Sequence, residues 1–187
     1  IVRVKLTICF FIASLLFYSC ATHSPQHGIK SAIPVASSDT LKPQPAHRIF
    51  LVGDAGYANE PHSRQLLHSI NEKLTGTGKN TTLIYLGDNI YPYGMPPQEK
   101  GQDRKEAEAS LNSQLALSKS FEGKIYFIPG NHDWYNGLKG LEEQEDFIEQ
   151  QLNDKKAFLP GKGCGINDVK INDNTTLVVI DSQWFIE

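Results

Sequence analysis

Three short apolar runs along the chain each end in a turn and are followed by polar residues. The runs cover residues 48–52, 82–86 and 124–128 and consist mainly of β-branched, aromatic and aliphatic side chains. Runs this short, bounded by turn-forming residues, are typical of buried strands, whereas a helix needs a longer periodic pattern. The sequence therefore predicts three strands, each of which delivers polar residues to its carboxyl end.

Segments with apolar residues three or four positions apart lie between and after these runs. Residues 61–74 predict a helix with Pro61 in its first turn, and residues 99–120 and 141–152 predict two more. Strand–helix–strand units are joined by right-handed crossovers, so the three strands should be parallel. The pattern as a whole predicts an α/β fold.

A further pair of extended segments follows the last predicted helix. Residues 169–172 and 176–181 are rich in strand-forming side chains, and Asp173 and Asn174 lie between them. Turn-forming residues between two such runs predict a hairpin or two neighbouring strands.

The first 46 residues differ in composition from the rest of the chain. Residues 1–20 have the basic start and short apolar run of a secretory signal peptide. Cys20 directly after that run resembles the cleavage site of a bacterial lipoprotein, although a plain signal peptide also fits. Residues 21–46, rich in Pro, Ser and His, predict a flexible linker, and residues 47–187 predict the folded domain. We therefore expect an exported protein, either lipid-anchored to a membrane surface or free in the periplasm or outside the cell.

Charge and cysteine content exclude several classes of protein. The net charge of -3 shows no basic surplus, so no nucleic-acid partner is expected. Cys9, Cys20 and Cys164 are too few and too widely spaced for a disulfide scaffold or a C-x-x-C zinc site. No G-x-G-x-x-G follows a predicted strand, which argues against dinucleotide binding.

Polar residues that follow the three predicted strands suggest a metal site. Asp54, Asp88 and Asn131 each come just after a strand, and parallel strands end at one edge of a sheet. A single Gly-Asp pair would be read as a turn, but two carboxylates at one edge repel each other unless a proton or a cation lies between them. With an amide oxygen and His132 beside them, they suit one or two hard divalent or trivalent metal ions.

The same three stretches resemble a known family. Gly-Asp-Ala-Gly at 53–56, Gly-Asp-Asn-Ile-Tyr at 87–91 and Gly-Asn-His-Asp at 130–133 look like the first three signature blocks of the calcineurin-like metallophosphoesterases. The first block lacks the commoner Asp-x-His form, and the second ends in Tyr91. This combination most resembles the purple, tartrate-resistant acid phosphatases. The resemblance implies an αββα sandwich and the hydrolysis of phosphate esters by a metal-bound hydroxide at a dinuclear site.

Roles for individual residues follow from the resemblance. Asp54 and Tyr91 would bind the first metal, Asp88 would bridge the two metals, and Asn131 would bind the second. The metal pair would be iron with iron, zinc or manganese. The alternative for Tyr91 is a loop aromatic that packs on the core.

Catalysis is implied for the end of the third block. His132 would contact the substrate phosphate and protonate the leaving oxygen, and Asp133 would assist as its supporting partner. Asp181, at the end of the last predicted strand, lies outside the ligand set of the family and is expected to be structural.

The chain also departs from the family pattern. No histidine follows His132, so the later histidine blocks that supply most of the remaining ligands do not occur. We therefore expect the sequence to represent the N-terminal part of such a domain, incomplete at its C-terminus. The alternative is a non-catalytic or inactive, truncated surface-anchored module that retains part of the fold.

Overall fold

The computed structural model describes residues 45–163 and 165–186. Cys164, almost all of the predicted linker and the predicted signal peptide, with the expected lipid site at Cys20, lie outside the described residues. Within the described ranges, no helix combines the length and apolar character needed to cross a membrane.

A parallel three-stranded sheet forms the centre of the domain. Its strands are β1 (Arg48–Val52), β2 (Thr81–Tyr85) and β3 (Lys124–Phe127), in the order β1-β2-β3. Both neighbouring pairs are parallel, and the last residues of the three strands are level with one another in the register. The predicted parallel arrangement is confirmed, so the loops after the strands leave the sheet at one edge.

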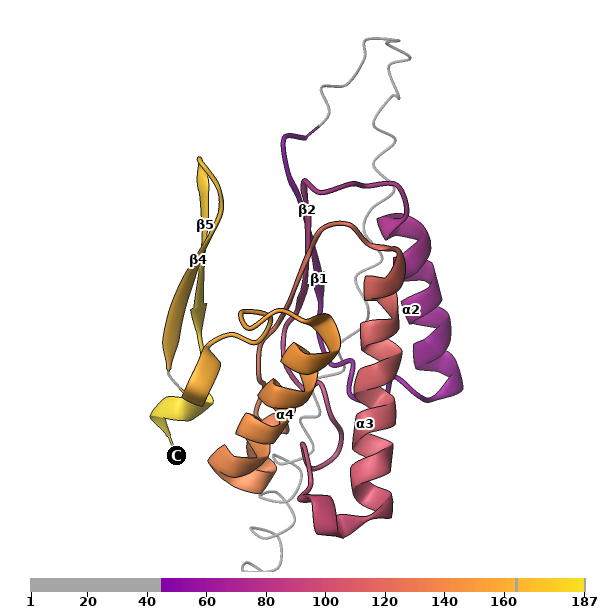
Figure 1. Ribbon diagram of the computed structural model, residues 1–187, viewed down its shortest axis with the longest axis vertical. Helices are drawn as coiled ribbons and strands as arrows, with labels where there is room; N and C mark the ends of the chain where they lie inside the picture. The colour runs from indigo at the N-terminus through magenta and orange to yellow at the C-terminus, as the bar shows by residue number, and fades with distance from the viewer. Residues whose placement is uncertain (1–44, 164, 187) are drawn as a thin grey trace, which may run out of the picture. The chain divides into compact units, whose positions relative to one another are not determined.

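Three α-helices cover one face of this sheet. They are α2 (Pro61–Leu74), α3 (Gln102–Leu115) and α4 (Gly137–Leu152), and Figure 1 shows α2 and α3 on the side of the sheet away from the hairpin. The core between helices and sheet includes Leu67, Leu83, Tyr85, Leu111, Phe127 and Ile148. All three predicted helices are present. The predicted helix at 99–120 is divided, because short 3₁₀ turns at Gln98–Lys100 and Ala116–Ser120 flank α3.

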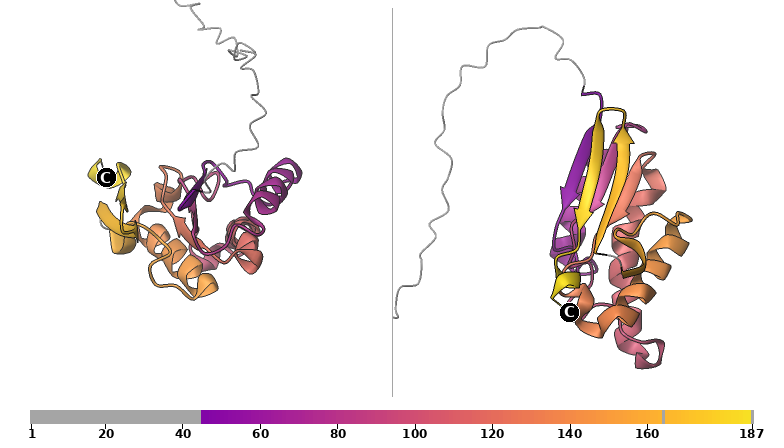
Figure 2. Two further views of the ribbon diagram at one scale, coloured as in Figure 1. Left: turned by 90° about the horizontal axis from the view of Figure 1, so that it is seen from above. Right: turned by 90° about the vertical axis from the view of Figure 1, so that its left-hand side faces the viewer.

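A hairpin covers the other face of the sheet. Its strands, β4 (Ile166–Asn172) and β5 (Thr175–Ile180), are antiparallel and form a second sheet (Figures 1 and 2). Val179 packs on Ile84 and Tyr126, so the alternating pattern of β5 places one set of side chains in the core. The hairpin prediction and the α/β fold class are confirmed, and the layers are helices, parallel sheet and hairpin.

Candidate metal centre

The loops after β1 and β2 place two carboxylates at the carboxyl edge of the sheet. Asp54 and Asp88 both adopt left-handed backbone conformations, with φ of 56° and 53°. The N–H of Asp54 donates to the carbonyl of Gly87 at 3.2 Å, which joins the two loops. A methyl group on Gly130 would lie 2.2 Å from Oδ1 of Asp88. The glycine in the third loop therefore lets that loop approach the Asp88 carboxylate.

The Tyr91 hydroxyl lies between these two carboxylates. It is 2.6 Å from Oδ1 of Asp54 and 2.8 Å from Oδ2 of Asp88. Desolvation and the two neighbouring carboxylates raise the pKa of Tyr91 above its ordinary value of 10.0. Three oxygen groups thus converge on one point, and two of them carry negative charge.

The third loop contributes Asn131 and His132. The backbone N–H of His132 donates to Oδ1 of Asp88 at 3.1 Å, and the Asn131 side chain is exposed at the same edge. Asn131 therefore lies next to His132, whose backbone N–H holds the Asp88 carboxylate.

The His132 ring is held by one hydrogen bond and two aromatic contacts. Its Nδ1 is 2.7 Å from the carbonyl oxygen of Pro92, and a carbonyl oxygen can only accept a hydrogen bond. Nδ1 therefore carries a proton, and Nε2 is the nitrogen left for a substrate. The rings of Tyr91 and Tyr135 contact the imidazole edge-on, with centroids 4.6 and 4.8 Å away.

Asp133 lies behind this edge and is fully buried. Its carboxylate accepts hydrogen bonds from the backbone N–H groups of Asn89, Ile90 and Gly130 and from the Gln144 amide. Burial raises the pKa of Asp133 from 3.8 to about 6, although these hydrogen bonds favour the charged form. The structure thus gives Asp133 a positioning role, since it joins the loops that carry Asp88 and His132.

Several residues that hold the site were not predicted as part of it. Gln144 bonds to Asp133, and Gln114 on α3 donates to the carbonyl groups of Ala55 and Asn89 in the first two loops. Both glutamines are fully buried and lie in register with apolar core residues of their helices, such as Leu111 and Ile148, which is the signal that could have found them. Asp181 is buried, and its Oδ2 accepts a hydrogen bond from the indole Nε1–H of Trp134 at 2.9 Å. This bond links the end of the hairpin to the residues after the third loop.

The oxygen donors present suit a hard cation. In the part of the chain that the structure describes, no three His, Cys, Asp or Glu side chains form a group that could hold a metal. The converging donors are instead two carboxylates and a phenol, from Asp54, Asp88 and Tyr91. Oxygen donors of this kind are typical ligands of divalent and trivalent metals, so this set fits the first ion of a metal centre.

The fold and the site define an α/β protein whose sheet edge carries candidate metal ligands. The family model for calcineurin-like phosphoesterases matches residues 47–183, so the chain belongs to this family. No curated protein and no solved structure matches the chain. Membership places the chain among hydrolases of phosphate esters, in a family that usually binds metal ions.

Proposed function

We propose that this protein hydrolyses phosphate esters with two metal ions bound at the carboxyl edge of its parallel sheet. Asp54, Asp88 and Tyr91 would hold the first ion, and Asp88 and Asn131 would contribute to the second. The observation that carries this proposal is the Tyr91 hydroxyl within hydrogen-bond distance of both carboxylates. A cation at this point would relieve the repulsion between the two negative groups.

The chain's own residues would orient the substrate and move a proton. When bound, the metal ions supply positive charge opposite the phosphate oxygens and lower the pKa of water. The backbone N–H of His132 holds the Asp88 carboxylate by a hydrogen bond. A second hydrogen bond, from Nδ1 of His132 to the Pro92 carbonyl oxygen, turns Nε2 away from Pro92. With Nδ1 donating to the Pro92 carbonyl, the ring would need a second proton on Nε2, which it would give to the leaving oxygen and so become neutral.

Removal of metal tests the proposal directly. Full-length protein should hydrolyse an aryl phosphate, lose that activity after chelation, and regain it when iron, zinc or manganese is returned. Phosphate release and metal content are measured on the same samples. A protein that binds metal and retains its fold without hydrolysis would support the alternative, a non-catalytic module.

The resemblance to the purple acid phosphatases adds a spectroscopic expectation. If Tyr91 binds ferric iron, the iron-loaded protein should be coloured, because a phenolate bound to ferric iron absorbs visible light. Tyr91→Phe removes the hydroxyl and should abolish this band, as measured by absorption spectroscopy at equal iron content. Tyr57→Phe is the matched control, since the Tyr57 ring stacks on Tyr91 at 5.0 Å and should leave the band unchanged. A colourless, active wild-type enzyme would argue for another metal.

A further inference from the structure

Two buried polar side chains on α3 connect the first two loops of the candidate metal centre. We infer that Gln114 is a positioning residue that sets the separation of the Asp54 and Asp88 carboxylates before a metal ion binds. Ser110, one helical turn earlier, assists it. This inference rests on the proposed function, because it concerns the ligands of the same metal centre.

The Gln114 side chain spans the two loops with a single amide group. Its Nε2 donates to the carbonyl oxygen of Ala55 at 3.2 Å and to that of Asn89 at 2.8 Å. Ala55 directly follows Asp54 in the chain. Asn89 directly follows Asp88 in the same way. One amide group therefore joins the backbone beside one carboxylate to the backbone beside the other.

The two loop carbonyl groups set the orientation of this amide. A carbonyl oxygen can only accept a hydrogen bond, so the NH₂ end of Gln114 must face Ala55 and Asn89. The other polar atom, Oε1, is buried and has no hydrogen-bond partner among the described residues. A buried oxygen of this kind costs free energy, which an apolar side chain would avoid. The two bonds to the loops are therefore what a glutamine contributes at this buried position.

Ser110 adds a second link, at the next residue of the first loop. Its hydroxyl donates to the carbonyl oxygen of Gly56 at 2.7 Å, and the same oxygen accepts the backbone N–H of Tyr91 at 3.3 Å. A methyl group on Gly56 would lie 2.5 Å from Cδ2 of Tyr91, so a glycine is needed for the two loops to come this close. Through this carbonyl group, α3 is also connected to the backbone of Tyr91, the third candidate ligand.

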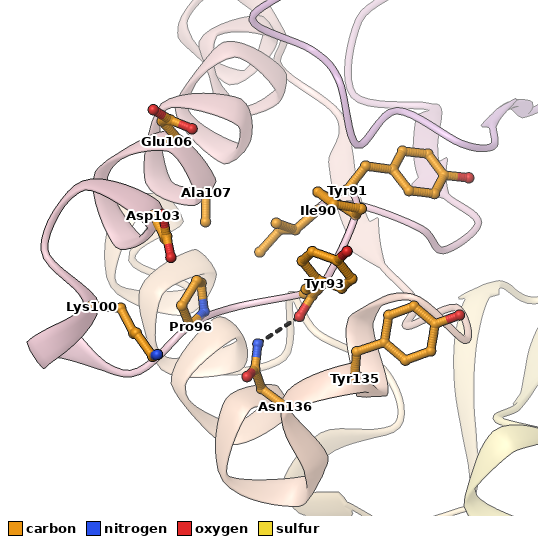
Figure 3. A pocket seen from close by; sticks show the side chains of 12 residues that line it. Ile90, Tyr91, Tyr93, Pro96, Lys100, Asp103, Glu106, Ala107, Tyr135 and Asn136 are labelled. Carbon is orange, nitrogen blue, oxygen red and sulfur yellow. Dashed lines mark hydrogen bonds between the residues drawn. The ribbon is translucent and has the colours of Figure 1, made fainter.

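The loop after β2 is held at a second point beyond Tyr91. The Asn136 side chain donates to the carbonyl oxygen of Tyr93 at 2.5 Å, a bond drawn in Figure 3. Tyr91 therefore lies between two fixed points of its loop, Asn89 and Tyr93. The bond from Gln114 also reaches the first loop, so its loss would loosen the contact between the two loops.

The converging ligands need support of this kind. Asp54 and Asp88 both lie within hydrogen-bond distance of the Tyr91 hydroxyl, and like charges repel until a cation binds. The backbone N–H groups of Asp54 and Tyr91 each donate across to the other loop, but these bonds are 3.2 and 3.3 Å long. The bonds from Ser110 and Gln114, at 2.7 and 2.8 Å, are shorter. They hold the ligands in place, which lowers the cost of ordering them when a metal ion binds.

Titration with Co²⁺ tests this inference without turnover, because the visible absorption of Co²⁺ depends on the geometry of its ligands. Full-length, chelated Gln114→Met should bind Co²⁺ about tenfold more weakly than the wild type, because methionine has a similar length but no donor. The spectrum of its bound Co²⁺ should also differ from that of the wild type. Ser110→Ala should weaken binding by about threefold, since the Gly56 carbonyl keeps its bond from Tyr91.

Two control variants separate positioning from a general effect on the fold. Ser113→Ala removes a hydroxyl whose bond, to the Ala109 carbonyl, stays within α3, and it should leave Co²⁺ binding unchanged. Leu74→Ala opens the core at the end of α2, where the chain turns toward β2. It should lower the stability of the protein without changing the affinity for Co²⁺ or the spectrum.

The inference is overturned if folded Gln114→Met has the affinity and spectrum of the wild type, or if Leu74→Ala shows an equal change in both. If Gln114→Met does not fold, Ser110→Ala decides, and wild-type affinity in that variant overturns the inference.

Activity separates this inference from the proposed function. Hydrolysis of phosphate esters by the wild type, together with normal Co²⁺ binding by Gln114→Met, overturns only the positioning role. Weakened Co²⁺ binding by Gln114→Met, without hydrolysis by the wild type, supports the positioning role and overturns only the proposed hydrolysis. A wild-type protein that binds no Co²⁺ overturns both.

Discussion

Replacement of Asp88 by Ala should lower the hydrolysis of phosphate esters by about 10³-fold, because several kcal/mol of transition-state stabilisation depend on the metal centre. The Asp88 carboxylate contacts two other parts of the site. One of its carboxylate oxygens lies beside the Tyr91 hydroxyl, and the other accepts the N–H of His132. Its loss would remove a ligand and release the loop that carries His132. The measurement is kcat/KM together with the metal content of each sample.

Two further variants separate the loss of charge from damage to the fold. Asp88→Asn retains an acceptor for the His132 N–H, and asparagine tolerates the left-handed backbone at this position, so this variant should fold and still be inactive. Asp168→Ala removes an exposed carboxylate from β4 and should be fully active. Activity of Asp88→Ala equal to that of the wild type would refute the site assignment.

The apolar runs predicted the parallel sheet because each buried strand carries its own signal. In β2 all five residues from Thr81 to Tyr85 are buried, so the strand is covered on both faces and its sequence is two threonines followed by an apolar run instead of an alternating pattern. The strand ends then placed Asp54, Asp88 and Asn131 at one edge, as the parallel register confirms. Strand periodicity thus predicted where these residues emerge.

The direction of the side chains within the loops could not be predicted in the same way. The contact of Tyr91 with both carboxylates depends on left-handed backbone at Asp54 and Asp88 and on the close approach of Gly130. These conformations depend on contacts between loops that are far apart in the sequence. A sequence pattern reflects only neighbouring residues, so it predicted the positions of the candidate ligands but not their geometry.

Asp133 illustrates the same limit. Its place beside His132 in the sequence suggested a partner in catalysis, but its carboxylate turns inward to the N–H groups of Asn89, Ile90 and Gly130. Two of these donors belong to a different loop, more than 40 positions away along the chain. Only the folded arrangement of β2 beside β3 brings them to one carboxylate.

Replacement of His132 by Gln should slow the hydrolysis of alkyl phosphates much more than that of phosphates with acidic leaving groups. General acid catalysis contributes about 10²- to 10⁴-fold, and an alkoxide needs a proton where a nitrophenolate does not. The hydrogen bond from Nδ1 to Pro92 and the contacts with Tyr91 and Tyr135 hold the ring, and the doubly protonated imidazole would donate its Nε2 proton to the leaving oxygen. The measurement is kcat/KM across a series of esters of rising leaving-group pKa, with His62→Gln, on exposed α2 surface, as the control. A steeper dependence on leaving-group pKa in His132→Gln identifies the ring as the proton donor, whereas an equal loss for every ester would mean that it only binds phosphate.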